Sequence, residues 1–280
     1  MNPKAVLTNI AVVISIMALA AAVEVFLPLF PRAKQRPGRV RANLSLMTLG
    51  FVVNWSLNSL VAIVAISLAA KPTSLLAMTN LPFAVQVIVT ILILDFVYGY
   101  LAHVLLHKIP FLWRVHRVHH ADPFVDVTTT SRTHPIETMW RFLLMTTAAW
   151  SLGLPAAGIV IYRLIGTTNG VLEHANIRLW LPFDRVASLI WVTPNMHKIH
   201  HSDEPTETDS NYGNILSLYD RTFGTFTSTD RAPHVVYGLR DPNGADVPSF
   251  AGLLTHPFAN QLREPERPKA DSEVTAQLSR

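Results

Sequence analysis

Three long apolar runs constrain the fold of this chain more than any other feature. They cover residues 5–30, 46–70 and 82–102, and each is near or above the roughly 20 residues that a helix needs to cross a bilayer. Only 15% of the 280 residues are charged, whereas an average soluble domain has about 25%. A soluble protein with a large buried core is the weaker alternative, because helices of globular proteins are rarely apolar on every face.

A fourth apolar segment covers residues 139–166 and is interrupted by Gly153, Pro155 and Gly158. Glycine and proline punctuate helices, so this segment predicts a helical hairpin that enters the membrane without crossing it. The sequence therefore predicts an all-α integral membrane fold with about four membrane-embedded helical segments. These are three spans plus a hairpin, and we expect a cytosolic, histidine-rich helical site to cap them.

Basic residues between the first two apolar runs predict the orientation of the spans. Short loops rich in Lys and Arg mark the cytoplasmic side of a membrane. The loop contains Arg32, Lys34, Arg36, Arg39 and Arg41. The third run would then end in the cytoplasm, and the net charge of +4 is no indication of a nucleic-acid partner. A cleaved signal peptide is the alternative for the N-terminus, because Ala18-Leu19-Ala20 resembles a cleavage site.

Histidines recur with helical spacing through the middle of the chain. The motifs are AHVLLH at 102–107, HRVHH at 116–120 and HKIHH at 197–201, and a further histidine follows Glu173. Side chains three and four residues apart share one helix face, so we expect each motif to aim its rings at a common point. The candidate metal ligands are His103, His107, His116, His119, His120, His174, His197, His200 and His201.

These candidate ligands are too many for one metal ion. A structural zinc takes four protein ligands and a catalytic zinc usually three, so one ion would leave four or more histidines unused. We therefore expect two metal ions. The chain has no cysteine, which excludes thiolate sites and disulfides, and histidine-rich coordination suits iron, copper, nickel or zinc. Beside a bilayer, a redox pair of irons can activate O2 and attack an inert C–H bond of a lipid.

Carboxylates near the motifs are candidates for orienting the ligands, because a carboxylate often fixes the tautomer of a ligating histidine. Asp95 lies eight residues before His103, about two helical turns, and is expected to share its face. The other carboxylates in this class are Asp122, Asp126, Glu137 and Glu173.

The remaining histidines and the aromatic residues predict the surroundings of the site. His134, which precedes Pro135, is expected in the substrate pocket or beside a ligand, whereas His234 and His256 are expected at the surface. We expect aromatic side chains to line a groove that admits the substrate from the bilayer. They are Trp113, Phe124, Trp140, Phe142 and Trp150.

Four segments together resemble the fatty acid hydroxylase superfamily, also called the sterol desaturase family. They are DFVYGYLAHVLLHKIPFLWRVHRVHHADP, SRTHPIE, LEHANIRL and TPNMHKIHHSDEPTETDSNYGNILSLYDRTFGTF, within about residues 85–230, and they look most similar to bacterial sterol-desaturase-like members. The resemblance implies a membrane-bound oxygenase in which the nine candidate histidines hold two iron ions. Some members have a further HxxxH pair before the last motif, but Gly170 stands at that position here.

This resemblance predicts three regions and the reaction class. Residues 1–84 would form the N-terminal transmembrane helices and basic loop, 85–230 the catalytic region, and 231–280 a polar tail that is disordered from Gln261. The protein would hydroxylate or desaturate a sterol, fatty acyl, sphingoid or ether lipid at the cytoplasmic side of a bacterial inner membrane. Because no dinucleotide-binding motif is visible, electrons would come from a separate ferredoxin, cytochrome or flavin reductase. The sequence does not predict an oligomeric state.

Two other classes of protein remain as alternatives. A membrane zinc hydrolase would need a carboxylate base beside the metal, as in HExxH, and neither HxxHH motif has a glutamate between its histidines. A non-enzymatic metal-binding or transport protein would place its ligands near the midplane of several spans. The histidines of this chain lie mostly in polar segments beyond the apolar runs.

Overall fold

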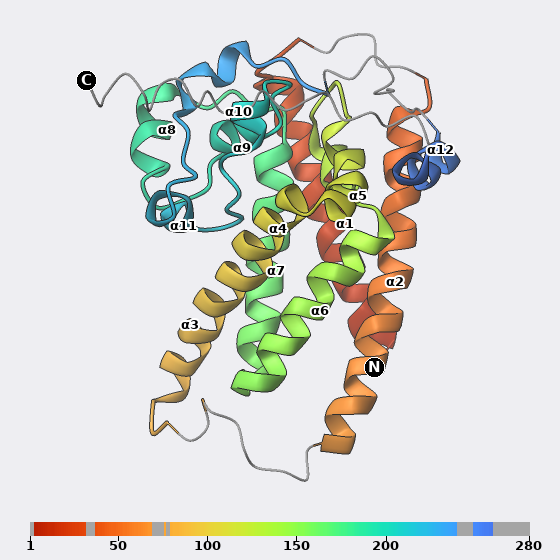
Figure 1. Cartoon of the computed structure of the whole chain (residues 1–280), viewed down its shortest axis with the longest axis vertical. Helices are drawn as coiled ribbons and strands as arrows, with labels where there is room; N and C mark the ends of the chain where they lie inside the picture. The colour runs from red at the N-terminus through yellow and green to blue at the C-terminus, as the bar shows by residue number, and fades with distance from the viewer. Residues whose placement is uncertain (1–2, 32–36, 69–75, 77–78, 240–248, 260–280) are drawn as a thin grey trace, which may run out of the picture.

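The computed structural model describes residues 3–31, 37–68, 76, 79–239 and 249–259. Within these ranges the chain forms helices and isolated bridges and no named β-strand, which confirms the expected all-α class. Long helices run along the long axis of the molecule, and shorter helices gather at one end of it (Figure 1).

The three apolar runs form long helices. The first run forms α1 (Pro3–Phe26), and most of the second lies within α2 (Arg39–Leu68). The third run forms a continuous helix made of α3 (Phe83–Leu94), a π-helical segment η1 (Asp95–Leu101) and α4 (Ala102–Lys108). This helix ends where expected, because the residue before Pro110 adopts an extended conformation that proline favours in its predecessor.

The hairpin predicted at 139–166 is present and extends beyond that range at both ends. It consists of α6 (Pro135–Leu152) and α7 (Ala156–His174), and Gly153 turns between them with φ of 63°. Gly158 lets α7 approach α3 closely, because a Cβ at this position would lie 2.6 Å from Cβ of Thr90. The helix α7 runs from the lower body to the end of the molecule where the short helices gather (Figure 1), and His174 is its last residue.

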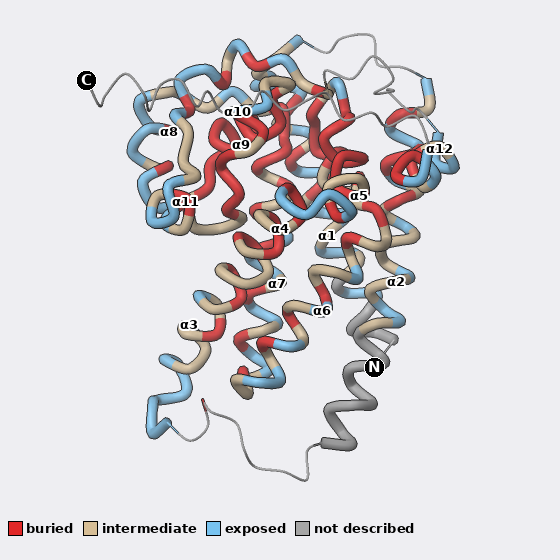
Figure 2. Tube along the Cα trace, in the orientation of Figure 1, coloured by how far each residue is buried: buried red, intermediate tan, exposed pale blue. Residues whose placement is uncertain are grey.

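The short helices form a cap over the long ones. They are α5 (Pro110–His120), α8 (Leu181–Ala187), α9 (Pro194–His200), α10 (Pro205–Thr208), α11 (Leu218–Thr222) and α12 (Phe250–Thr255). Three 3-10 turns accompany them, Val127–Ser131, Thr229–His234 and His256–Phe258. Buried residues concentrate where α4, α5 and α9 meet (Figure 2). The cap is thus the most densely packed part of the described chain.

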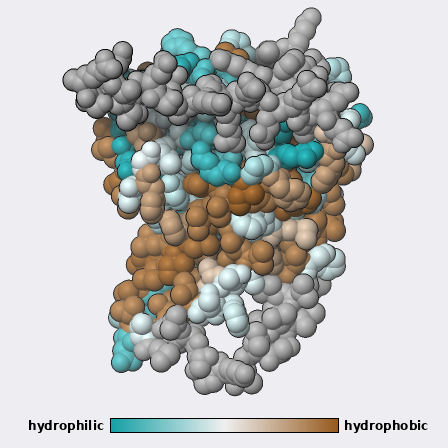
Figure 3. All heavy atoms as spheres, viewed as in Figure 1, coloured by the Kyte–Doolittle hydropathy of each residue, from teal (hydrophilic) through white to brown (hydrophobic). Residues whose placement is uncertain are grey.

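The lower body is apolar on its outside (Figure 3). Leu19, Trp150 and Val160, for example, expose 69%, 68% and 66% of their surface. Among the described residues, one helix is long and apolar enough to cross a membrane, Phe83–Lys108 with 26 residues. The expected number of spans and the bilayer itself therefore remain predictions.

Two expectations about polar residues are wrong. Arg39 does not lie in the basic loop but is the first residue of α2, where it is buried and paired with Asp122, at 2.7 Å, and with Asp126, since buried carboxylates need a compensating cation. His256 is not a surface residue, because the segment 249–259 folds back against α2 and α5 and buries it. The positions 32–36 of the basic loop and the tail from Gln261 lie outside the described residues.

Candidate metal centre

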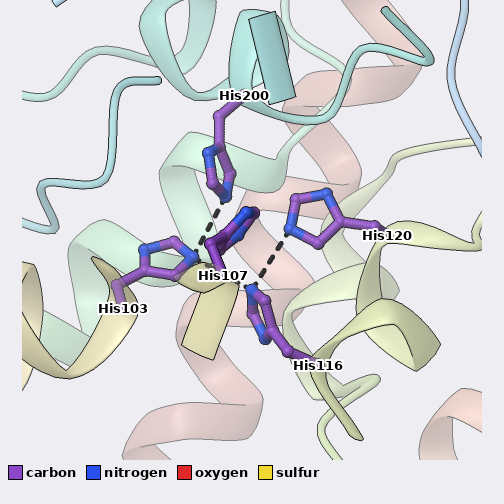
Figure 4. Close-up of side chains that lie close together, drawn as sticks. All are labelled: His103, His107, His116, His120 and His200. Atoms are coloured by element: carbon purple, nitrogen blue, oxygen red, sulfur yellow. Dashed lines mark hydrogen bonds between the residues drawn. The ribbon is translucent and has the colours of Figure 1, made fainter. Parts of the chain in front are cut away.

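All nine candidate histidines meet inside the cap, and they form two groups. The five-histidine cluster contains His103, His107, His116, His120 and His200, and Figure 4 shows their rings converging. The four-histidine cluster contains His119, His174, His197 and His201. All nine are buried, and in each cluster the potential ligand atoms lie within 4.8 Å of one another.

Helix geometry divides each HxxHH motif between the two clusters. His116 and His120, four residues apart on α5, join the same cluster, whereas His119 joins the other. Successive side chains are about 100° apart around a helix, so adjacent histidines cannot aim at one point. The third motif divides in the same way. His197 on α9 and His201 just after it join the four-histidine cluster, whereas His200 joins the five-histidine cluster. The expectation that each motif serves one point was therefore wrong for both HxxHH motifs.

The two clusters adjoin each other. The ring centroids of His120 and His201 are 4.6 Å apart, and those of His197 and His200 are 5.1 Å apart, although each pair joins different clusters. The two clusters therefore form one binuclear candidate site.

The Nε2 atoms have the spacing of ligands around a metal. In the five-histidine cluster, Nε2 of His103 lies 3.0 Å from Nε2 of His116 and of His200. In the other cluster, Nε2 of His174 lies 2.9 Å from that of His119 and 3.0 Å from that of His197. Two ligands at about 2.1 Å from an ion and at right angles are about 3 Å apart. The spacing fits a coordination sphere in both clusters.

The tautomers of three histidines leave Nε2 free to bind a cation. Nδ1 of His103, His200 and His174 donates to the carbonyl oxygens of Tyr212 (2.8 Å), Ser210 (2.7 Å) and Gly170 (2.6 Å). A carbonyl only accepts, so Nε2 of a neutral ring carries a lone pair.

These lone pairs face each other in the five-histidine cluster. Burial lowers the pKa of His200 far below its usual value, which disfavours a proton on this ring. Two lone pairs facing each other at 3.0 Å, as in His103 and His200, are stable only with a shared cation between them. The residues present therefore fit a metal.

Carboxylates support the five-histidine cluster from outside. Oε2 of Glu137 accepts from Nδ1 of His116 at 2.8 Å, and its other oxygen accepts from Arg141 at 2.9 Å. Burial would raise the pKa of Glu137, but His116 and Arg141 together lower it to about 2. Asp209 lies 3.3 Å from Nδ1 of His107 and accepts from Lys108. Two rings of this cluster, those of His116 and His107, therefore have a carboxylate beside Nδ1.

The four-histidine cluster has fewer such supports. His174 donates to the Gly170 carbonyl, but Nδ1 of His119, His197 and His201 has no hydrogen-bond partner among the described residues. Glu173 is the nearest carboxylate, with Oε1 3.9 Å from both His174 and His197. The two metal sites are therefore inequivalent.

The other predicted residues lie elsewhere. Asp95 accepts from the backbone of Ile215 (3.1 Å) and Leu216 (3.0 Å) and contacts none of the nine histidines through a hydrogen bond described here. Its predicted place beside His103 assumed regular α-helix, but η1 is π-helical, with i→i+5 bonds that change the angular offset. His134 caps α6, where Nδ1 accepts from Ile136. Asp122 and Asp126 both bind Arg39.

The predicted groove residues are also dispersed. The Trp113 ring lies 4.9 Å from that of His107 and 5.5 Å from that of His120. Phe142 is buried in the core between the long helices, and Trp150 is largely exposed. Of these three, only Trp113 borders the histidines.

Contacts of Asp209 and Ser210 with the histidine rings were not predicted from the sequence. Asp209, Ser210 and Tyr212 all contact ligand rings, one through its side chain and two through backbone carbonyls. Asn211 allows this turn, with φ of 53°, and its side chain binds the backbone on both sides. Asp209 could have been considered from the sequence, because it is a carboxylate within ten residues of HKIHH. The contacts of Ser210 and Tyr212 could not, because every residue has a backbone carbonyl.

An all-helical protein with two adjoining, buried histidine clusters is a candidate binuclear metalloprotein. Residues 87–225, which include all nine histidines, match the model of the fatty acid hydroxylase family. The chain belongs to the fatty acid hydroxylase superfamily, as its motifs suggested.

Several characterised proteins are similar to this chain over part of their length. An ornithine lipid hydroxylase, OlsE of Rhizobium tropici, is 32% identical over 184 residues, which cover 65% of this chain and 53% of that protein. The alkylglycerol monooxygenase of Danio rerio is 27% identical over 57% of this chain and 34% of its own length, and that of Caenorhabditis elegans is 26% identical over 52% and 28%. The chain thus spans about half or less of these relatives. No solved structure matches it significantly.

Proposed function

We propose that this protein is a membrane-bound lipid oxygenase that holds two iron ions in its two histidine clusters and hydroxylates or desaturates a C–H position of its substrate. The observation that carries this proposal is the convergence of nine buried Nε2 atoms in two adjoining groups. The relatives that are named as a lipid hydroxylase and as monooxygenases support the same class of reaction.

The donor set is compatible with iron, and membership of the superfamily favours iron over the other candidates. Imidazole suits iron, copper, nickel and zinc, and of these iron pairs are associated with oxygenation in proteins of this superfamily. When bound, the two irons supply the redox chemistry that activates O2 and oxidises a C–H bond. In this proposal, electrons come from a separate ferredoxin, cytochrome or flavin reductase. The visible polar residues lie mostly above the apolar belt (Figure 3), so we expect this electron donor to dock on the cap.

The residues of the chain hold and protect this site. Carbonyls of Tyr212 and Ser210 keep His103 and His200 in the tautomer that offers Nε2. Glu137 accepts the Nδ1 proton of His116 and so raises the electron density at its Nε2. Burial of all nine rings excludes bulk water, which prevents side reactions of reactive species. Trp113 gives the five-histidine cluster an apolar wall.

The substrate of this proposal is a lipid that enters from the apolar lower body. In this proposal the exposed apolar helices below the cap lie in the bilayer of the inner membrane. Lipid acyl chains would then lie beside the site. The clusters are formed by α4, at the upper end of the apolar helix that begins at Phe83, and by helices that gather above it (Figure 1). A substrate with its head group at the interface would therefore present a carbon near its polar end.

The zinc hydrolase alternative has less support. A hydrolase needs a free carboxylate base and an open metal position. Glu137, a carboxylate that directly contacts a ligand ring, is held by His116 and by Arg141. Five histidines in one cluster also leave less room for a metal-bound water than the three protein ligands of a catalytic zinc.

Lipid analysis under 18O2 tests the proposed reaction. Cells that express the chain are expected to accumulate lipids carrying one 18O atom, or lacking two hydrogens, relative to cells without it. A His119→Ala variant should lose this product, and His234→Ala should retain it, because His234 is exposed and outside both clusters. A product that contains no 18O and retains every hydrogen, or full activity in His119→Ala, would refute the oxygenase.

A further inference from the structure

We infer that Glu173 is the fifth ligand of the metal in the four-histidine cluster, so that one ion has five imidazoles and the other has four imidazoles and a carboxylate. This inference rests on the proposed binuclear site and concerns the ligand set of its second ion.

The asymmetry of the helices points to this position. The helical segments α4, α5 and α9 each contribute a pair of histidines four residues apart, namely His103 and His107, His116 and His120, and His197 and His201. The helix α7 contributes His174 alone. The position four residues before it, on the same helix face, is Gly170, which has no side chain to offer.

The carboxylate of Glu173 lies beside this vacant helix position. A Cβ at Gly170 would be 3.9 Å from Oε1 of Glu173, and apart from its chain neighbours and the backbone of its own helix no other described atom is within 4 Å of it. The same oxygen lies 3.9 Å from Nε2 of His197, the nitrogen that faces the cluster. With metal bonds of about 2.0–2.2 Å, two ligands of one ion are at most about 4.3 Å apart. The oxygen is therefore within ligand-to-ligand range of His197, but it is not within 4.8 Å of every nitrogen of the cluster. Binding to the ion thus requires a change of the Glu173 rotamer that turns the carboxylate towards the cluster.

The surroundings of Glu173 favour binding to a cation. The side chain is buried, and its described hydrogen bond is a long one of 3.3 Å from Asn169. No lysine or arginine pairs with it in the part of the chain that the structure describes. An ionised carboxylate in such a place is costly unless a charge compensates it, and a metal ion in the four-histidine cluster provides that charge.

Gly170 also leaves room for a histidine side chain that could replace Glu173 as the fifth ligand. Gly170 is helical and its carbonyl, which accepts from His174 and Thr130, would remain in any substitution. A histidine at 170 would complete a fourth i, i+4 pair. The double variant Gly170→His/Glu173→Gln should therefore restore a fifth ligand that Glu173→Gln removes.

The experiment is a titration of metal-free, full-length protein in detergent with Co(II), whose visible spectrum depends on the ligands and their number. Wild type should bind two ions. Glu173→Gln should bind the second ion on the order of 10–100-fold more weakly, with a changed spectrum, and the double variant should recover the affinity. Glu207→Gln is the matched control, because this buried carboxylate pairs with Arg231 and contacts no cluster histidine.

Each outcome decides the inference. A Glu173→Gln variant that binds both ions with the wild-type spectrum overturns it, while two ions in wild type leave the proposed function standing. Weaker binding with an unchanged spectrum and no recovery in the double variant also overturns it, because Glu173 then only positions a ligand. A wild type that binds fewer than two ions refutes the proposed function itself. Should Glu173→Gln not fold, Glu173→Asp replaces it: the shorter carboxylate should weaken binding of the second ion and change its spectrum, and wild-type affinity with the wild-type spectrum overturns the inference.

Discussion

Histidines that are neighbours in the sequence belong to different clusters. His200 joins the five-histidine cluster and His201 joins the four-histidine cluster, since adjacent residues point about 100° apart on a helix. Alanine at either position should therefore remove one ion and leave the other.

The first prediction uses this pair. His200→Ala and His201→Ala should each retain about one metal ion per chain, and the retained ions should differ in their Co(II) spectra. Metal analysis of the two purified variants checks the number, and absorption spectroscopy checks the difference. Identical spectra, or loss of both ions from one substitution, would mean that the two rings share a single site.

The second prediction concerns the carboxylate behind a ligand. Glu137→Gln keeps the shape of the side chain but removes the charge that accepts from His116, so the five-histidine cluster should bind its ion on the order of 10–100-fold more weakly. Competition with a chelator measures the affinity. Asp230→Asn is the control, because Asp230 pairs with Arg185 at the exposed surface. Equal affinities in the two variants would contradict the role of Glu137.

Residue types and spacing predicted which histidines converge, but not how they divide into two groups. The i, i+4 pairs and the number of histidines named all nine rings that the structure brings together, and the two ions they would hold stay a prediction. The helical offset separates adjacent histidines, but which cluster each one joins depends on how α4, α5, α7 and α9 face one another, which no single motif encodes. The supports from Tyr212 and Ser210 come from backbone carbonyls, which every residue carries.

At the scale of elements, α1 contributes to the cap although it precedes the region that matches the family. Glu24 of α1 accepts from the backbone N–H of Val127 and of Asn176, each at 2.8 Å. Val127 follows the second motif and Asn176 follows His174. One carboxylate thus ties two loops that continue from ligands of the four-histidine cluster.

The third prediction tests this tie. Glu24→Gln replaces a charged acceptor with a neutral one, and hydrogen bonds to charged groups contribute about 1 kcal/mol more than neutral ones. The variant should unfold at a lower temperature and release the ion of the four-histidine cluster more readily. Thermal unfolding and chelator competition check these effects. Unfolding and metal release identical to those of wild type would show that the tie is unimportant.

The elements themselves were predictable to different degrees. Apolar runs and a proline predicted the long helices and the end of α4, and Gly153 predicted the hairpin turn. The π-helical segment Asp95–Leu101 was not predicted, because its residues are compatible with α-helix and the i→i+5 pattern depends on packing against α6 and the segment at Ile215. Asp95 was therefore expected beside His103 and instead holds that segment.

At the scale of the whole molecule, we expect bound metal ions and the fold to stabilise each other. Nine buried rings with facing lone pairs repel one another without a cation, so removal of metal should loosen the cap while the long helices persist. The fourth prediction is that chelation lowers the temperature of unfolding and increases hydrogen exchange in α5 and α9, with little change in α6. Exchange that is unchanged in α5 and α9 would contradict a structural role of the metal.

The central claim is that the nine histidines hold two iron ions, and iron content measures it most directly. Protein purified from iron-supplied cells should contain about two irons per chain by mass spectrometry of the metals, and His119→Ala, which removes a ligand from one cluster, should contain about one. Two irons in wild type with one in the variant is the result we predict. Zinc alone, or one iron in the wild-type protein, would contradict it.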